Sequence, residues 1–349
     1  MRAVKVVAFL LGAFLLFWIV RKIGVQELLT GFRTLGWRLV IPVAIIFPCF
    51  LIYTFSWELF LKRFEHHSIP FWTLFRIKVA GEASNTLTPL NFAGGDPIRV
   101  WLLSRNFPVD IGGASVVVDR TLQSLAVVSI IFLGNMAAIF KLDLPVYAKS
   151  ILGVTAGLVL LLILFFVFHQ TKGLFQKLSR LAERFKIRKF SEKSLQKIEE
   201  LDQHLEEFYR GDRRLFFFCY LLHVCGRFIG MVELIVVGRL LGVPMGFWEA
   251  LFFAAVIPAT NLIGSIVPGN LGVLEGVVSS LFFALKWDPS SGVVLQIARR
   301  LRAFVWILAG LIFMFFFKVE KKKSAEKNQV NKQVERHEDL RGVPHITEE

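Results

Sequence analysis

The stretch GEASNTLTPLNFAGGDPIRV, residues 81–100, is repeated in outline by TNLIGSIVPGNLGVLEGVV, residues 260–278. Both contain Pro-x-Asn followed by one or two glycines, and Pro268 lies 179 positions after Pro89. Each proline is followed seven positions later by an acidic residue and thirty-one positions later by an arginine: Asp96 and Arg120, and Glu275 and Arg299. Such backbone survives at membrane depth only where protein or a water-filled cavity satisfies its polar groups. Paired interrupted segments of this kind point to the binding site of a membrane transporter.

The composition predicts a membrane protein. Hydrophobic residues make up 55% of the 349 residues and the mean hydropathy is +0.59, whereas soluble domains are about 45–50% apolar. Several apolar stretches exceed the roughly 18 residues that a spanning helix needs. We therefore predict an all-α, polytopic integral membrane protein with about six full spans and two broken or re-entrant helical hairpins. The spans are expected at about 4–21, 40–61, 114–140, 148–168, 215–241 and 293–317, and the hairpins at about 72–98 and 248–286.

The net charge of +14 comes from cations that flank apolar spans, which is the positive-inside pattern and argues against a nucleic-acid partner. The linker 170–214 carries 12 Lys/Arg against 8 Asp/Glu, and its first part has the apolar spacing of an amphipathic helix. We expect this helix on the anionic cytoplasmic leaflet. The alternative is a solvated connector whose apolar stripe packs on the protein. The tail 319–349 is charged and is expected to be cytoplasmic and disordered.

The same charges predict the domain organisation and the topology. Residues 1–318 form one transmembrane domain with halves 1–169 and 215–318, joined by the linker. If the linker and the tail are both cytoplasmic, the two hairpins open to opposite sides, as in an inverted repeat. The basic run at the end of the second span also predicts a cytoplasmic side: Lys62, Arg63, Arg76 and Lys78. The first apolar stretch resembles a signal peptide in length, but it lacks a small-x-small cleavage site, which favours an uncleaved span.

Charged residues within spans are costly, and here they gather around the two motifs. We interpret them as the lining of a polar cavity for a charged headgroup, because the guanidinium fork of arginine binds phosphate in bidentate fashion. The alternative is that Asp119, Arg120 and Arg299 form internal ion pairs and that the asparagines cap broken helix ends. The candidate cavity residues are Glu82, Asn85, Pro89, Asn91, Gly94, Gly95, Asp96, Arg99, Asp119, Arg120, Asn261, Pro268, Gly269, Asn270, Gly272, Glu275 and Arg299.

Other residues carry less information about function. His223 lies four positions before Arg227, and we interpret it as a buried core histidine rather than a proton relay. The sequence contains no Walker loop, nucleophile elbow, HExxH or dinucleotide fingerprint. We therefore expect no metal and no cofactor.

Four stretches resemble the lysylphosphatidylglycerol synthase transmembrane family, whose membrane module is described as flippase-like. They are GEASNTLTPLNFAGGDPIRVWLLSR, VVVDRTLQSLAVV, VPGNLGVLEGVVSSLF and IARRLRAFVWILAG, and the resemblance covers nearly all of residues 4–318. The family's pattern falls on Asn85, Pro89, Gly94, Gly95, Asp96, Arg99, Asp119, Arg120, Pro268, Gly269, Gly272, Glu275 and Arg299. Where many members carry Arg-Trp in the second span, this chain has Ser56-Trp57.

The resemblance implies a membrane module without the synthase domain, in the cytoplasmic (inner) membrane of a bacterium or archaeon. In the full-length synthases, a similar membrane domain moves aminoacylated phosphatidylglycerol between leaflets, and a separate cytoplasmic domain makes that lipid. We accordingly expect translocation or handling of a lipid with a charged headgroup, and no enzymatic activity. The alternatives are an accessory subunit of lipid or glycan assembly, and a headgroup-modifying enzyme that uses Asp96 or Glu275 as acid or base.

Overall fold

The computed structural model describes residues 25–63, 68–87, 94–169, 213–264, 267 and 270–340, and all regular secondary structure within them is helical. The predicted span at 4–21, nearly all of the linker and the centres of both Pro-x-Asn motifs lie outside these residues. The helices are α2 (Val25–Leu35), η1 (Gly36–Leu39), α3 (Val40–Leu61), α4 (Phe71–Leu87), α5 (Gly95–Leu103), α6 (Val109–Lys141), α7 (Val146–His169), α10 (Arg213–Leu240), α11 (Phe247–Ile263), α12 (Val273–Ala284) and α13 (Pro289–Leu340).

Four of the described helical segments are long and apolar enough to cross a membrane: Arg33–Leu61, Val109–Lys141, Arg213–Leu240 and Pro289–Phe317. Because an α-helix rises about 1.5 Å per residue, roughly 20 residues cover the hydrocarbon core. Shorter apolar segments accompany them, at Val146–Leu161, Phe247–Leu262 and Val273–Ala284. The prediction of an all-helical, multi-pass membrane protein is confirmed. Four predicted spans coincide with α3, α6, α10 and α13, and a fifth falls on α7.

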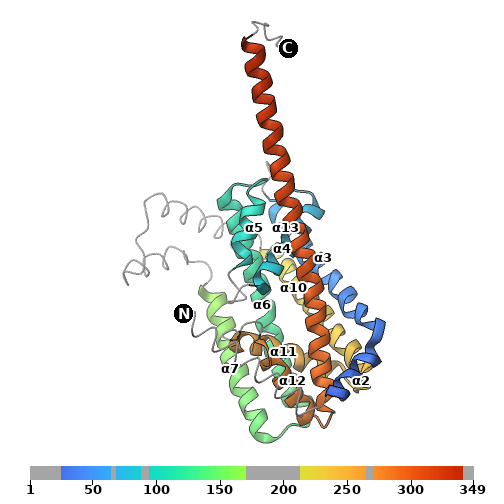
Figure 1. Cartoon of the computed structure of the whole chain (residues 1–349). Coiled ribbons are helices and arrows are strands. Elements are labelled where there is room, and N and C mark those ends of the chain that lie inside the picture. The colour runs from blue at the N-terminus through green and yellow to red at the C-terminus, as the bar shows by residue number, and fades with distance from the viewer. Residues whose placement is uncertain are drawn as a thin grey trace.

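Each region of the repeated motif forms two helices separated by a break. Residues 88–94 separate α4 from α5, and residues 264–272 separate α11 from α12. The second break passes through left-handed backbone, with φ of 51° at Asn270 and 75° at Gly272, a conformation that asparagine and glycine adopt most easily. In Figure 1, α5 lies near the end of the bundle from which α13 projects, and α12 lies near the opposite end.

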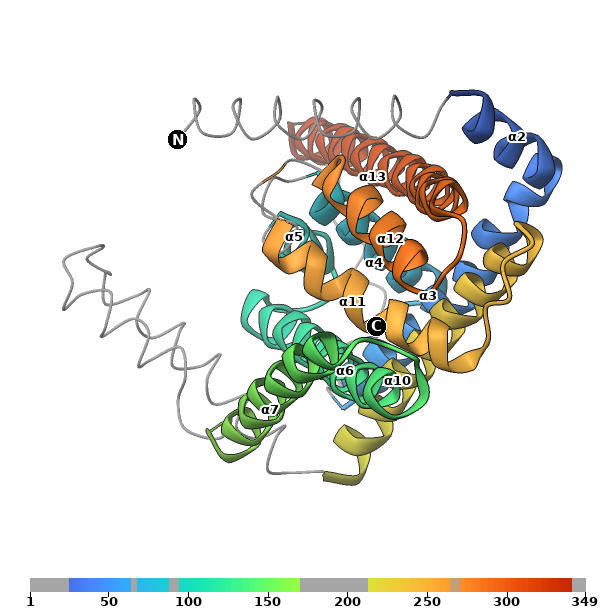
Figure 2. The same ribbon diagram turned by 90° about the horizontal axis from the view of Figure 1, so that it is seen from below.

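The helix pairs on either side of the two breaks, α4–α5 and α11–α12, each contact both halves of the chain. The first helix of each pair packs along the long helix that belongs to the other half: α4 along α13, and α11 along α6. The second helix of each pair packs on the long helix of its own half, α5 on α6 and α12 on α13. Helices α3 and α10 pack along each other, and both contact this arrangement (Figure 2).

Glycines allow helices of different halves to approach closely. A Cβ atom on Gly310 of α13 would lie 2.8 Å from the carbonyl oxygen of Val79 in α4. A Cβ atom on Gly134 of α6 would lie 2.5 Å from the carbonyl oxygen of Leu251 in α11. Small residues at helix crossings are the usual means of close packing in membranes. The crossing of α4 with α13 therefore uses the same device as the crossing of α11 with α6.

Helix α13 is continuous from Pro289 to Leu340 and projects beyond the bundle (Figure 1). Helical backbone thus extends into the segment after residue 318, for which the sequence predicted disorder. This segment is rich in Lys, Glu and Gln, which have high helix propensity. A helix that is already nucleated in the bundle can propagate through such residues without a new nucleation step.

Polarity in the bundle is the reverse of that in a soluble domain. Large apolar side chains are exposed on the outside, such as Ile151, Leu158, Phe304, Ile312 and Phe315. Charged side chains are buried inside: Lys78, Arg99, Asp119, Glu233 and Glu275. Because buried charges in a membrane protein are expensive, they mark functional or strongly paired positions.

Candidate functional site

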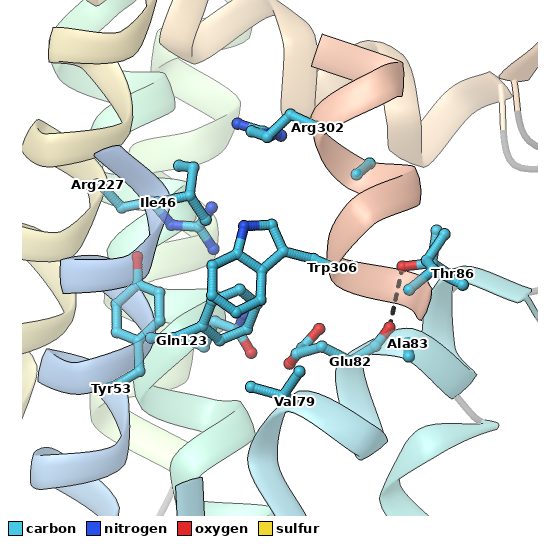
Figure 3. Close-up of a pocket in the computed structure, with 13 residues that line it drawn as sticks. Ile46, Tyr53, Val79, Glu82, Ala83, Thr86, Gln123, Arg227, Arg302 and Trp306 are labelled. Atoms are coloured by element: carbon cyan, nitrogen blue, oxygen red, sulfur yellow. Dashed lines mark hydrogen bonds between the residues drawn. The ribbon is translucent and has the colours of Figure 1, made fainter. Parts of the chain in front are cut away.

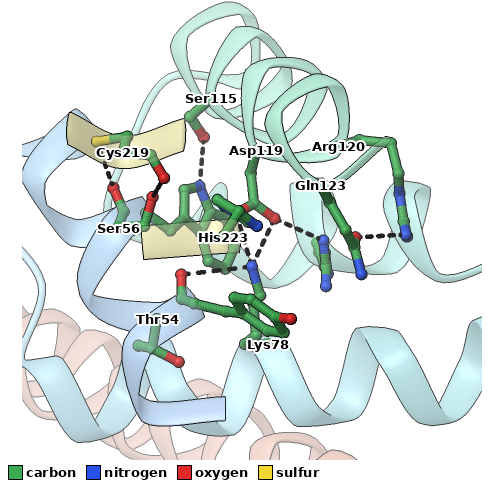
Figure 4. Close-up of polar contacts among 12 residues, drawn as sticks. Thr54, Ser56, Lys78, Ser115, Asp119, Arg120, Gln123, Cys219 and His223 are labelled. Atoms are coloured by element: carbon green, nitrogen blue, oxygen red, sulfur yellow. Dashed lines mark hydrogen bonds and ion pairs between the residues drawn. The ribbon is translucent and has the colours of Figure 1, made fainter. Parts of the chain in front are cut away.

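Six charged side chains from α4, α5 and α6 form one network, here called the Asp119 cluster, and Figure 4 shows three of them, Lys78, Asp119 and Arg120. Its members are Lys78, Glu82, Asp96, Arg99, Asp119 and Arg120, and each lies within salt-bridge distance of an opposite charge. Three members are cations and three are anions, so their formal charges balance. All except Lys78 were predicted as site residues.

Asp119 has two cationic partners. The Nζ atom of Lys78 lies 2.6 Å from both carboxylate oxygens of Asp119, and Arg99 Nη1 donates to Oδ2 at 3.1 Å. All three side chains are buried, and a buried carboxylate is tolerated only when it is paired in this way. Lys78, which the sequence grouped with a basic run at the cytoplasmic side, is buried inside the bundle. Its apolar neighbours in the sequence, Ile77 and Val79, could have indicated that Lys78 is buried.

Arg120 follows Asp119 in the chain but has a different partner, because successive residues on an α-helix point about 100° apart. Its Nη2 and Nε atoms donate to the two carboxylate oxygens of Asp96 at 2.7 and 3.1 Å. Its Nη1 donates to Gln123 Oε1 at 2.8 Å. Asp119 and Arg120 therefore each hold an internal ion pair, and the Asp96 pair ties the start of α5 to α6.

Close packing of α4 against α5 positions Arg99. A Cβ atom on Gly95 would lie 1.9 Å from the carbonyl oxygen of Gly81, and a Cβ on Gly81 would lie 2.4 Å from Arg99 Nε. The amide of Gly95 donates to Asn85 Oδ1 at 2.7 Å, so Asn85 satisfies the amino end of α5. From this position Arg99 Nη2 reaches Glu82 at 2.6 Å. The predicted capping role of asparagine is thus observed at Asn85.

The second break is held by a similar ion pair. Glu275, at the start of α12, bonds Arg300 of α13 and accepts from the amide of Gly272 at 2.9 Å. Arg300 Nη2 also donates to the carbonyl oxygen of Asn270 at 2.9 Å, and Asn270 Nδ2 donates to Asn261 Oδ1 at 2.8 Å. The repeat spacing pointed to Arg299 as the counterpart of Arg120. The arginine that pairs with Glu275 is instead the next residue, Arg300.

Arg299 faces a third group of charges, around Glu233 of α10. Its Nε atom lies 3.6 Å from Glu233 Oε2, and Arg302 Nη1 hydrogen-bonds the same oxygen. Glu233 is completely buried. One turn and a half before Glu233 on α10 lies Arg227, for which the described residues provide no ion pair and no acceptor for Nε.

A cavity of about 270 Å³ lies between α3, α4, α6, α10 and α13 (Figure 3). Arg227 and Arg302 border it from α10 and α13, and Glu82 borders it from α4. The other lining residues are Ile46, Phe50, Tyr53, Val79, Ala83, Thr86, Gln123, Ala303, Trp306 and Ile307. Among the predicted site residues, Glu82 lines the cavity, whereas Arg99 and Asp119 lie behind it in the Asp119 cluster.

The charge around the cavity is unbalanced. The Asp119 cluster is neutral as a whole. Arg299 and Arg302 share one described carboxylate, Glu233, and the described residues provide no ion pair for Arg227. Neither Arg227 nor Arg302 was among the predicted site residues. The arrangement can accept an anion, because it offers guanidinium donors without enough acidic partners.

Pro89, Asn91, Pro268 and Gly269 lie outside the described residues. Gly94 precedes α5 as its N-cap residue and has no side chain that could bind a ligand. No group of three His, Cys, Asp or Glu side chains that could hold a metal ion occurs within the part of the chain that the structure describes.

Comparisons with known proteins place this arrangement in a family. A search of curated proteins finds no match. Residues 5–310 match the family described as the lysylphosphatidylglycerol synthase TM region. This match includes both breaks, the Asp119 cluster and every residue that lines the cavity. The chain therefore belongs to the lysylphosphatidylglycerol synthase TM region family.

Proposed function

We propose that the protein binds a membrane lipid by its anionic headgroup in the cavity and moves that headgroup across the bilayer. The observation that carries this proposal is the excess of positive charge at the cavity. Arg227 and Arg302 both border it, and there are too few described carboxylates to neutralise them. A guanidinium inside a membrane protein needs a counter-charge. A lipid phosphate supplies it, and the planar fork of arginine matches two phosphate oxygens.

The dimensions and lining of the cavity suit a headgroup. At about 270 Å³, the cavity is near the lower limit of small-molecule sites, which are roughly 300–1,000 Å³. It can therefore enclose a polar headgroup while the acyl chains remain in the bilayer. Tyr53 and Trp306 add aromatic surface with polar tips, and Glu82 and Gln123 add acceptors opposite the arginines.

The architecture supports movement of the headgroup between the two sides. The broken pairs α4–α5 and α11–α12 lie toward opposite ends of the bundle, and each is tied to a long helix by one carboxylate–arginine pair. The matching glycine crossings at Gly134 and Gly310 add a second correspondence. We interpret the halves as an inverted repeat. In transporters built this way, the site lies at the repeat interface and rocking of the halves exposes it alternately.

The same contacts argue for a transport role over acid–base catalysis. Asp96 and Glu275 were the candidate acid or base residues, and both are engaged by arginines at the breaks. A carboxylate held in such a pair is occupied in fixing the backbone and is not free to exchange a proton with a substrate. We therefore assign Asp96 and Glu275 to positioning the two breaks.

Transport can be tested in vesicles. The full-length protein is reconstituted into phosphatidylcholine vesicles that contain a fluorescent phosphatidylglycerol, and the label accessible to an external quencher is followed with time. Arg227→Lys and Arg302→Lys keep the charge but lose the fork. We expect each to slow translocation at least about tenfold, since a charge-assisted hydrogen bond contributes about 1.5–3 kcal/mol.

Arg38→Lys is the matched control, because Arg38 is exposed on η1 and far in sequence from the cavity residues of α10 and α13. This control is expected to translocate the lipid at the wild-type rate. Normal insertion together with full translocation in both cavity variants would contradict the assignment of the anion site. No translocation by the wild-type protein would contradict the transport function itself.

A further inference from the structure

A buried histidine lies behind the cavity wall. The imidazole of His223, on α10, is 1% exposed and stacks on the ring of Tyr53 with centroids 4.9 Å apart. Tyr53 in turn lines the cavity. The Nε2 atom of His223 lies 3.4 Å from Asp119 Oδ1, but neither ring nitrogen makes a well-formed hydrogen bond to the described residues. Buried polar groups are normally hydrogen-bonded, so an unsatisfied imidazole in this position calls for an explanation.

The imidazole lies beside the Asp119 cluster. Asp119 of α6 faces it directly, Lys78 of α4 and Arg99 of α5 bond the same carboxylate, and Arg227 lies one turn further along α10. Tyr53 of α3 covers its face. Because the Asp119 cluster is neutral with an uncharged imidazole, a proton on His223 would add an uncompensated positive charge. In a desolvated interior such a charge is strongly unfavourable.

An anion in the cavity changes this balance. It would lie between Arg227 and Arg302, in a cavity that Tyr53 lines, and His223 stacks on the ring of Tyr53. A second connection runs through Glu82, which lines the cavity and bonds Arg99, which in turn bonds Asp119. Tyr53 and this chain of ion pairs therefore connect the cavity to His223, and opposite charges interact strongly where water is excluded.

We propose that His223 binds a proton when an anionic headgroup occupies the cavity and releases it when the headgroup leaves. The proton comes from the aqueous phase and is accepted by the lone pair of an imidazole nitrogen, beside the Asp119 carboxylate. This inference rests on the proposed function, and it identifies the carried unit as a lipid monoanion together with one proton. Such a unit is neutral, so the membrane potential does no work on it, whereas a pH difference across the membrane drives it.

Proton uptake can be measured directly on the full-length protein in detergent. Dihexanoyl phosphatidylglycerol is the probe, because its phosphodiester does not titrate near neutral pH. It is added to protein in weakly buffered solution that contains a pH indicator. We expect uptake approaching one proton per bound probe at pH values where His223 is uncharged in the empty protein and protonated in the probe complex. Probe binding without proton uptake, measured between pH 6 and 9, would overturn the proposal.

The affinity of the probe provides a second measurement. If binding is linked to one proton, the affinity falls up to about tenfold for each unit of rising pH. His223→Gln should remove this slope, because glutamine cannot be protonated. The matched control is His337→Gln, in α13 beyond the last predicted span, which should keep the wild-type slope. A His223→Gln protein that folds and retains the slope would contradict the assignment of the proton to His223.

The outcomes separate this inference from the proposed function. If the wild-type protein does not bind the probe at any pH, the anion site itself is wrong. If it binds the probe with the same affinity at all pH values, the anion site is supported and the assignment of a proton to His223 is wrong. Should His223→Gln fail to fold, the uptake measurement on the wild-type protein still decides between these outcomes, since it needs no variant.

Discussion

The two breaks use the same contact and differ in the charges that surround them. In the amino-terminal half, Arg120 pairs with Asp96 within a neutral network of six charges. In the carboxy-terminal half, Arg300 pairs with Glu275, but the neighbouring arginines outnumber their carboxylates. The carboxylate–arginine pair holds the backbone at both breaks. The amino-terminal half balances its charges internally, whereas the carboxy-terminal half leaves positive charge at the cavity. The variants below test this difference.

The largest effect is expected from Asp119→Ala. It leaves Lys78 and Arg99 buried without their shared carboxylate, and breaking a buried ion pair from one side costs about 3–5 kcal/mol. Glu233→Ala should cost less, because its arginine partners are partly exposed. The measurement is thermal unfolding in detergent, followed by size-exclusion chromatography.

Asp143→Ala serves as the control for both acidic variants, since Asp143 is exposed in the loop between α6 and α7. Its unfolding temperature should equal that of the wild type. If Glu233→Ala destabilised the protein as much as Asp119→Ala, the claimed difference in charge balance between the halves would not hold.

The glycine crossings should respond alike in the two halves. Gly134→Ala and Gly310→Ala each force a methyl group to within 3 Å of a carbonyl oxygen on the facing helix. Overpacking of this kind costs typically about 1–3 kcal/mol. The same unfolding assay measures it, and Gly157→Ala is the control because a Cβ atom there meets nothing within 4 Å. A neutral result at one crossing alone would break the correspondence between the halves.

The two arginines at the breaks should show smaller, matched effects. Arg120→Lys and Arg300→Lys keep the charge but lose one arm of the carboxylate pair. Because both side chains are partly exposed, we expect a loss of about 1 kcal/mol in each. Arg299, one residue away, makes a longer contact of 3.6 Å with Glu233. Arg299→Lys should therefore change stability less. A larger effect at Arg299 than at Arg300 would favour the original repeat spacing.

The smallest effect concerns the starts of α6 and α13, which differ in their caps. No side-chain cap is formed at the start of α6, whereas Asp288 accepts from the amides of Ser290 and Ser291 at 3.1 and 3.0 Å before α13. Burial acts to raise the pKa of Asp288, but hydrogen bonds from these serines outweigh it and hold the pKa below its ordinary value.

The ionised cap therefore stabilises the fold above the unfolded pKa of about 3.9, and this contribution is lost as the pH falls through the lower folded pKa. Asp288→Ala should cost about 1 kcal/mol at pH 6. Its deficit relative to the wild type should shrink as unfolding is measured at progressively lower pH below 4. A deficit that stays constant with pH would show that the cap does not act through its charge.

Composition and local chemistry were sufficient to predict the long apolar helices and both breaks, but not α2, η1 or the extension of α13 to Leu340. Long apolar runs specify spans, and the Gly-Asn pattern around Pro268 cannot continue a helix. The spacing also identified Asp96 and Glu275, because the local sequence starts a helix at each of them. Pairing could not be predicted in the same way. Arg299 and Arg300 are adjacent, and the rotation of α13 decides which of them meets Glu275.

Lys78 and the cavity lay beyond sequence reasoning for related reasons. A lysine near the end of a predicted span fits the positive-inside pattern, and its burial depends on a partner on α6. The cavity is assembled from five helices whose lining residues run from Ile46 to Ile307. No local pattern marks Arg227 and Arg302 as neighbours of Glu82, since their proximity depends on how α4, α10 and α13 pack.

The ion pairs also divide the helices into two mechanical bodies. Charged contacts tie α4, α5 and α6 together, and a second set ties α10, α12 and α13. Within the described residues, the contact between ionisable side chains that joins the two bodies is that of His223 with Asp119. Gly310 and Gly134 allow α13 to pack closely on α4 and α6 to pack closely on α11. Bodies tied internally in this way are the units that we expect to move as wholes, by small shear displacements. On the proposed protonation of His223, its contact with Asp119 becomes an ion pair and holds the two bodies together most strongly while the cavity is occupied.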